Sequence, residues 1–209
     1  MKTLFIDSSR KSLSVALADD DKLLFVSNVE SNSKHSNYLL NEINNILTKL
    51  NLKIQDIDNY IVLNGPGSFT GIRVGVTVSK TLAWSLSKKM YVLSNLKALA
   101  LHCDNEIVIS VIPDKKDNSY IGIYNEDEKE EYININDISF NNKKITLVSM
   151  EDNNVIDDLY KKLSTNNDVD IKIIKDYDYL KLIKYALSKK DINPHEAKPV
   201  YLKKIDAEK

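Results

Sequence analysis

Asn64-Gly65-Pro66-Gly67-Ser68-Phe69-Thr70-Gly71-Ile72-Arg73-Val74-Gly75 is the stretch on which the fold prediction rests. It holds four of the chain's five glycines and follows Tyr60-Ile61-Val62-Leu63, an apolar run typical of a short buried strand. Because proline cannot donate to a strand ladder and glycine adopts positive φ, Gly65-Pro66-Gly67 predicts that the strand ends there. Ser68 is a good N-cap, so a helix is predicted from Phe69 to about Ser87.

The glycine-rich turn matches neither common phosphate-binding fingerprint. A P-loop needs Lys and then Ser or Thr after its last glycine, but Ile72 and Arg73 follow Gly71. The dinucleotide pattern fails because its third glycine comes one residue late. A tight turn with an N-cap is one interpretation. The other is an anion site formed by backbone amides at the helix N-terminus, with Gly65, Gly67 and Ser68 as its candidate residues.

Small residues recur every four positions along the predicted helix, so they lie on one face. Two of them are glycines, each of which costs a helix interior roughly 1 kcal/mol relative to alanine. Such a stripe predicts close approach by another element, either within the subunit or from a second subunit. Its members are Gly71, Gly75, Ser79 and Ala83.

The composition bounds the class of protein. The chain has 209 residues, 43% of them hydrophobic and 28% charged, which is ordinary for one globular domain or two compact lobes. Its formal net charge of -1 gives no global basic field for autonomous nucleic-acid binding. The single cysteine, Cys103, excludes an intrachain disulfide. No apolar run approaches a membrane span, so we expect no membrane partner and a cytoplasmic location.

Each half of the chain begins with strand patterns and continues with alternating helices and strands. This repetition predicts two α/β lobes, residues 1–104 and 105–209, in a duplicated arrangement. The second lobe is the smaller and more divergent, and its tail is a candidate to pack back on the first lobe. The acidic run from Glu126 to Glu131 is interpreted as a solvated turn, and Pro113 as the end of a strand. The predicted strands are 2–7, 12–17, 23–29, 60–63, 91–93, 107–112, 119–124, 131–135, 145–150 and 171–174, and the predicted helices are 39–50, 69–87, 94–101, 155–163 and 179–187.

Three stretches together resemble a known family. Leu4-Phe5-Ile6-Asp7-Ser8-Ser9 resembles the first strand and phosphate hairpin of the actin, Hsp70 and sugar-kinase (ASKHA) superfold. Within that superfold, His35-Ser36-x-x-Leu39-Leu40 and the string from Gly65 to Gly75 resemble the TsaB (YeaZ) family, as does the tail Pro199-Val200-Tyr201-Leu202-Lys203. The likeness covers about the first 105 residues and the tail, and it implies an ASKHA fold with two lobes, each with a mixed sheet and flanking helices.

The resemblance implies a role in making threonylcarbamoyladenosine. TsaB proteins are non-catalytic partners that pair with and activate TsaD, which modifies N6 of adenosine 37 in tRNAs reading codons that begin with A. The resemblance also implies docking of a TsaE-like ATPase, a homodimer when the chain is alone, and tRNA contact only through the complex. Two departures from the family pattern are Asn41 and Lys203, which replaces the tail arginine.

The family pairs through its first two helices, which correspond here to Leu39–Leu50 and Phe69–Ser87. An apolar stripe on the first of these helices would join the small stripe on the second in one interface. The alternative is that both stripes cover the lobe's own sheet. The predicted interface residues are Leu39, Ile43, Ile46, Gly71, Gly75, Ser79 and Ala83.

No catalytic or metal-ligating set is predicted. No two of His35, His102 and His195 are four residues apart, so the His-x-x-x-His site of TsaD is missing. We therefore expect no cofactor to be required by this chain, with ATP and Mg²⁺ acting at the level of the complex. The alternative is an ATP-binding or ATP-hydrolysing enzyme of the sugar-kinase type, in which Asp7 and Ser8 support Mg²⁺ and phosphate. Asp7 is otherwise interpreted as a hairpin carboxylate that caps backbone amides.

Overall fold

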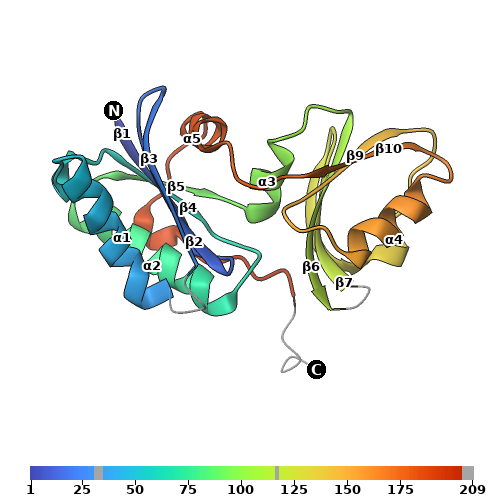
Figure 1. Cartoon of the computed structure of the whole chain (residues 1–209), viewed down its shortest axis with the longest axis horizontal. Coiled ribbons are helices and arrows are strands. Elements are labelled where there is room, and N and C mark those ends of the chain that lie inside the picture. The colour runs from blue at the N-terminus through green and yellow to red at the C-terminus, as the bar shows by residue number, and fades with distance from the viewer. Residues whose placement is uncertain (31–34, 116–117, 204–209) are drawn as a thin grey trace. The chain divides into compact units, whose positions relative to one another are not determined.

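The computed structural model describes residues 1–30, 35–115 and 118–203, and the side chains of residues 35–37 are outside that description. The described residues form two compact units (Figure 1). Unit 1 comprises Met1–Asn95 and Asp178–Val200, and unit 2 comprises Leu96–Tyr177 with the described residues from Tyr201 on.

Unit 1 is built on a five-stranded mixed sheet. The first three strands form the predicted antiparallel meander, and the last two run parallel to the first, in the order β3-β2-β1-β4-β5. The strands are β1 (Lys2–Asp7), β2 (Ser12–Asp19), β3 (Lys22–Glu30), β4 (Asn59–Leu63) and β5 (Lys89–Leu93).

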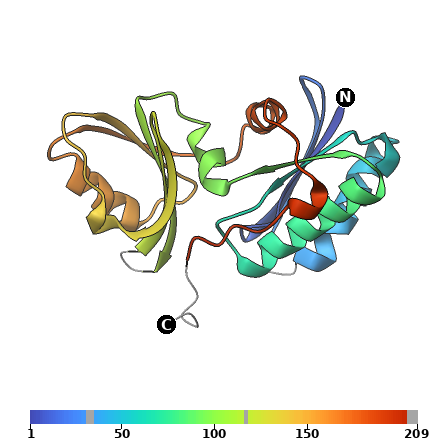
Figure 2. The same cartoon turned by 180° about the vertical axis from the view of Figure 1, so that it is seen from behind.

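Helices cover both faces of this sheet. Figure 1 and Figure 2 show α1 (His35–Lys49) and α2 (Phe69–Ser85) on one side and α5 (Tyr179–Leu187) on the other. Side chains alternate along β1, so Leu4 and Ile6 point into the core that includes residues of α1 and α2. Phe5 points to the other face, where its ring centre lies 5.6 Å from that of Tyr179, with the two ring planes at 78°. Short 3-10 turns η1 (Ile54–Asp56) and η3 (Pro194–Glu196) complete the unit.

The core between the sheet and the two long helices uses the apolar faces predicted from periodicity. Its fully or nearly buried members are Leu4, Ile6, Leu13, Val15, Leu17, Leu39, Ile43, Ile46, Leu47, Ile57, Tyr60, Val62, Ile72, Val76, Ala83, Met90 and Ala197.

Unit 2 repeats the strand order of unit 1. Read from its meander, the sheet is β8-β7-β6-β9-β10, with the first three strands antiparallel and the last two parallel to β6. Ile156, Leu159 and Leu163 of α4 pack on one of its faces. The elements are α3 (Asn95–Ala100), β6 (Ile107–Lys115), β7 (Asn118–Tyr124), β8 (Glu128–Asn134), η2 (Ile135–Asp137), β9 (Lys144–Ser149), α4 (Asn154–Leu163) and β10 (Asp168–Ile173).

Two boundary predictions in unit 2 are wrong. The acidic run is not all turn, because β8 begins at Glu128 and pairs with the whole of β7; Glu130 accepts a hydrogen bond from the Tyr124 hydroxyl at 2.6 Å. Pro113 does not end β6, which continues to Lys115 through a register shift against β7. Cross-strand pairing therefore overrides the local preferences of both segments.

Residues 178–200 lie with unit 1, although they follow the strands of unit 2 in sequence. Residue 96 begins unit 2, so α3 starts at the point where the chain passes from one unit to the other. The predicted division into lobes of residues 1–104 and 105–209 stays a prediction. In the structure, the contacts of residues 178–200 group them with the unit that contains strands β1 to β5.

Candidate functional site

The loop after β4 has the geometry predicted from its composition. Gly65 has a φ of +114°, and a Cβ there would lie 2.8 Å from the carbonyl oxygen of Val200, so both conformation and space require glycine. Helix α2 begins at Phe69, and the Ser68 hydroxyl accepts a hydrogen bond from the Gly71 amide at 3.3 Å. The predicted N-cap is confirmed.

Backbone amides of this loop donate hydrogen bonds to other residues of the protein. The Gly65 amide donates to the side-chain oxygen of Asn95 at 2.9 Å, and the Ser68 amide donates to the Ser9 carbonyl at 2.7 Å. A Cβ at Gly67 would lie 2.6 Å from the same Ser9 carbonyl, so Gly67 permits close packing on the first hairpin. These contacts use amides that a phosphate-binding nest would direct at its ligand.

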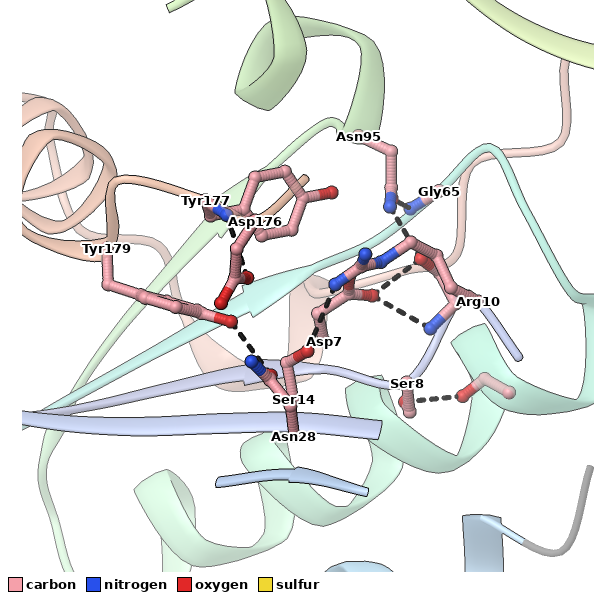
Figure 3. A network of polar contacts seen from close by, with 12 residues as sticks. Asp7, Ser8, Arg10, Ser14, Asn28, Gly65, Asn95, Asp176, Tyr177 and Tyr179 are labelled. Atoms are coloured by element: carbon pink, nitrogen blue, oxygen red, sulfur yellow. Dashed lines mark hydrogen bonds and ion pairs between the residues drawn. The ribbon is translucent and has the colours of Figure 1, made fainter. Parts of the chain in front are cut away.

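Asp7 is the centre of a polar network at the β1–β2 hairpin (Figure 3). One carboxylate oxygen accepts from the Ser9 amide at 2.9 Å and the Ser9 hydroxyl at 2.6 Å. The other accepts from Nε of Arg10 at 2.7 Å, and Nη2 of Arg10 donates to the Ser14 hydroxyl at 3.0 Å. The Asp7 side chain is fully buried. The interpretation of Asp7 as a carboxylate that caps a backbone amide is thus what the structure shows.

Asn95 connects this network to the loop before α2. Its side-chain nitrogen donates to the Ser9 hydroxyl at 2.5 Å, while its oxygen accepts from Gly65 and its own amide donates to the Gly65 carbonyl at 2.8 Å. Asn95 is buried, so each of these bonds satisfies a group that water does not reach. Sequence reasoning missed Asn95 because its partners are 30 and 86 residues away.

The residues present do not fit a magnesium–nucleotide centre on Asp7. Magnesium binds oxygen at about 2.0–2.1 Å and usually keeps several waters, whereas this carboxylate is fully buried and already holds a guanidinium cation. Ser8, the other residue predicted to support phosphate, faces the opposite side of the sheet, where its hydroxyl donates to the Gly71 carbonyl at 2.8 Å. The structure does not bring Asp7 and Ser8 together on one site.

The small stripe on α2 faces the interior of its own unit. Gly71, Gly75, Ser79 and Ala83 are all buried, and a Cβ on Gly75 would overlap the Ser8 hydroxyl. The close approach predicted by the stripe is therefore made within unit 1, by Ser8 directly after β1 and by the sheet beneath it. This burial corrects the prediction that these four residues form a partner-facing surface.

The predicted stripe on α1 is likewise internal. Leu39, Ile43 and Ile46 are buried in the core of unit 1 together with Leu4 and Leu17. The alternative that both stripes cover the lobe's own sheet is what the structure shows. The side chains of His35 and Ser36 in the family motif lie outside the described part of the chain.

Large apolar side chains instead occupy the outer faces of the same two helices. Leu40 on α1 is 54% exposed, and Phe69 and Trp84 on α2 are 46% and 62% exposed. The Arg73 guanidinium lies 3.7 Å from the centre of the Phe69 ring, and the ring centres of His195 and Trp84 are 5.5 Å apart, with the two planes at 65°. Leu40 and Trp84 each directly follow a buried residue, Leu39 and Ala83, and so lie about a quarter turn from the buried face of their helix. We call Leu40, Phe69, Arg73 and Trp84 the outer face.

The tail is anchored in both units by separate contacts. In unit 1 the Val200 amide donates to the Asn64 carbonyl at 2.8 Å. In unit 2 Nζ of Lys203 and the Tyr132 hydroxyl donate to one oxygen of Asp114 at 2.5 and 2.7 Å. Partial burial acts to raise the pKa of Asp114, but these two hydrogen bonds together with the charges of Lys203 and Lys115 outweigh it, so the pKa lies below its usual value. Lysine at position 203 thus makes a carboxylate contact without the bidentate geometry of arginine.

Among the described residues, no group of three or more His, Cys, Asp and Glu side chains is arranged to hold a metal ion. Within the same part of the chain, no helix combines the length and the apolar character needed to cross a membrane.

Comparison with known proteins identifies the family to which the chain belongs. Residues 28–180 match the family model described as TsaD, tRNA N6-adenosine threonylcarbamoyltransferase. The TsaB protein of Bacillus subtilis is 33% identical over 129 residues, covering 59% of this chain and 55% of the relative. Escherichia coli TsaB is 31% identical over 103 residues, covering 48% and 43%. The chain thus spans about half the length of the curated relatives it matches.

A solved structure matches over nearly the whole chain. YeaZ from Pseudomonas aeruginosa superposes with a TM-score of 0.77 and 20% identity, covering 96% of this chain and 99% of that one. At this identity the match establishes the fold. Together with the two mixed sheets and their flanking helices, it confirms the predicted actin, Hsp70 and sugar-kinase-like architecture.

Proposed function

We propose, because this chain belongs to the TsaB (YeaZ) proteins within the family described as TsaD, that it is a non-catalytic subunit in threonylcarbamoyladenosine synthesis. It dimerises with a TsaD-like catalytic paralogue and activates threonylcarbamoyl transfer to N6 of adenosine 37 in tRNAs that read codons beginning with A. A cytoplasmic location goes with this role.

The outer face of α1 and α2 is the observation that carries the proposal. The buried stripes hold both helices on the sheet of unit 1, so their remaining surfaces are rigidly presented. Leu40, Phe69 and Trp84 are large apolar groups on these surfaces, and Arg73 adds a guanidinium stacked on an aromatic ring. Aromatic and arginine side chains are the groups that most often dominate the binding energy of protein interfaces.

The same face supports the further partners. When the paralogue is absent, two copies of this chain pair as a homodimer through the outer face, because each copy presents the same surface to the other. A TsaE-like ATPase docks on the assembled pair. The chain's balanced charge supports tRNA contact through the complex and not through this subunit alone.

Two features of the side chains support the proposal that the chain has no activity of its own. No two histidines stand four apart in the sequence, and the carboxylate of Asp7 is bound internally by Arg10 and Ser9. The alternative of a sugar-kinase-like ATPase is therefore not favoured, because its magnesium ligand would be Asp7.

Co-expression with a tagged TsaD-like protein from the same organism tests the proposal. Trp84→Arg should reduce recovery of this chain at least tenfold, because a charge is forced into the apolar centre of the interface. Tyr160→Arg, at a 38% exposed aromatic on α4, is the matched control and should leave recovery unchanged. If wild-type chain is not recovered, or if both variants bind like wild type, the proposal is wrong.

A further inference from the structure

The Arg10 side chain lies against the carboxylate of Asp7, the group that a sugar-kinase-like enzyme would use here to hold magnesium. We propose that Arg10 is a resident cation of the β1–β2 hairpin, which neutralises Asp7 in place of a metal ion and closes this site to magnesium–nucleotide. The inference concerns the hairpin and does not rest on the proposed pairing with TsaD.

Local sequence places the guanidinium on the carboxylate. Arg10 follows Asp7 by three residues, and the hairpin turn brings its Nε to 2.7 Å from the Asp7 carboxylate. The second contact, from Nη2 to the Ser14 hydroxyl at 3.0 Å, fixes the orientation of the planar group. Ser14 pairs directly with Asp7 across β1 and β2, so both anchors stand side by side on the sheet.

Burial of the Asp7–Arg10 ion pair disfavours the binding of a metal ion to the same carboxylate. The Asp7 side chain is fully buried and that of Arg10 is 26% exposed, so the pair is only partly screened by water. A guanidinium stays protonated in proteins, so it cannot make way for a metal by losing a proton. A magnesium ion bound to the same carboxylate would stand beside a like charge and would also have to shed most of its waters.

The network transmits this closure to α2. From Asp7 the bonds continue through the Ser9 hydroxyl and Asn95 to the Gly65 amide, and Ser9 also accepts from the Ser68 amide at the start of α2. The helix start is therefore held by groups that the protein itself supplies. The outer face of α2 would then be presented in the same way with or without nucleotide.

Thermal unfolding of the full chain, with Mg²⁺ alone and with a magnesium complex of a non-hydrolysable ATP analogue, tests the proposal. Neither addition should move the wild-type midpoint. Arg10→Met should lower it by about 5 °C, because it leaves a buried carboxylate without its cation. Lys11→Met removes an adjacent exposed charge and should change the midpoint little.

The double variant Asp7→Asn with Arg10→Met separates the ion pair from a general loss of packing. It should lose less than Arg10→Met alone, since no charge is then left buried. If Arg10→Met does not fold, recovery of folded protein in the double variant carries the same meaning. The proposal is overturned if the magnesium–nucleotide complex raises the wild-type midpoint and Asp7→Asn abolishes that rise. It is also overturned if Arg10→Met and Lys11→Met have equal midpoints.

Discussion

The hydroxyl of Ser8 occupies the space that a Cβ on Gly75 would need. Helix α2 can therefore lie this close to Ser8, the residue directly after β1, only while residue 75 is glycine. The contact is reinforced one turn earlier, where the same hydroxyl donates to the Gly71 carbonyl at 2.8 Å. The glycines of this helix thus serve the packing of the subunit itself.

Gly75→Ala should destabilise the chain by roughly 1–2 kcal/mol. Overpacking costs about 1–3 kcal/mol, and alanine's better helix propensity returns up to about 1 kcal/mol. Urea unfolding followed by circular dichroism measures the difference. Thr77→Ala, at an exposed position on the same helix, is the control and should change stability by less than about 0.5 kcal/mol. A variant as stable as wild type would show that α2 does not press on Ser8.

The neighbouring residues Leu39 and Leu40 should respond oppositely to lysine. Leu39 is fully buried, so Leu39→Lys places a charge in the core and should cost at least about 4 kcal/mol or prevent folding. Leu40 is 54% exposed, so Leu40→Lys should keep the thermal midpoint and weaken self-association. Circular dichroism measures the change in stability, and sedimentation velocity measures the change in self-association. Unchanged sedimentation of Leu40→Lys relative to a self-associating wild type would remove Leu40 from the proposed interface.

Asn95→Ala should cost about 2 kcal/mol of unfolding free energy, because the Gly65 amide is left buried without its acceptor and the Ser9 hydroxyl loses a donor. Asn44→Ala, at an exposed position of α1, is the matched substitution without buried partners. Denaturant titration of both variants compares them. Equal stability of the two would show that the bonds through Asn95 contribute nothing to the fold.

The contact between Asp114 and Lys203 should depend on pH. The pKa of Asp114 is lowered in the folded chain from its ordinary 3.8, so its stabilisation is complete above that value and is lost as the pH falls through the folded pKa. The pKa of Lys203 is raised, chiefly by its hydrogen bond to Asp114, so its contribution is lost only at strongly alkaline pH.

Asp114→Asn should therefore lower the thermal midpoint at pH 7, and the difference from wild type should shrink as the pH falls below 3.8. Asp158→Asn, in an exposed pair on α4, is the control and should show no comparable trend. A difference that stays constant from pH 7 to pH 3 would show that Asp114 acts through something other than its charge.

The fold was predictable where local signals are strong. Strand β1 and helix α5 have the predicted bounds, and Ser68 caps α2 as its side-chain chemistry indicates. The start of β8 at Glu128 was not predictable, because a charged run becomes strand only through pairing with β7. Likewise, the spacing of Gly71 and Gly75 indicates close approach, but only the folded structure shows that Ser8 of the first hairpin is the residue that approaches.

The candidate site was less predictable than the fold. Asp7 was identified from its place at the end of a strand, yet its partner Arg10 was not, because nothing in spacing alone shows that a side chain folds back on its own hairpin. Trp84 was missed because periodicity identifies the buried face of a helix, and Trp84 lies outside that face.

The association of residues 178–200 with the first unit decides how this protein can be divided for expression. A fragment that stops near residue 104 would lack α5, leaving Phe5 without Tyr179 and one side of the sheet uncovered. Such a truncation should collect in inclusion bodies, whereas a fusion of residues 1–95 to residues 178–200 through a flexible linker retains every element of that unit. Recombinant work on the unit that carries α1 and α2 therefore has to include residues 178–200.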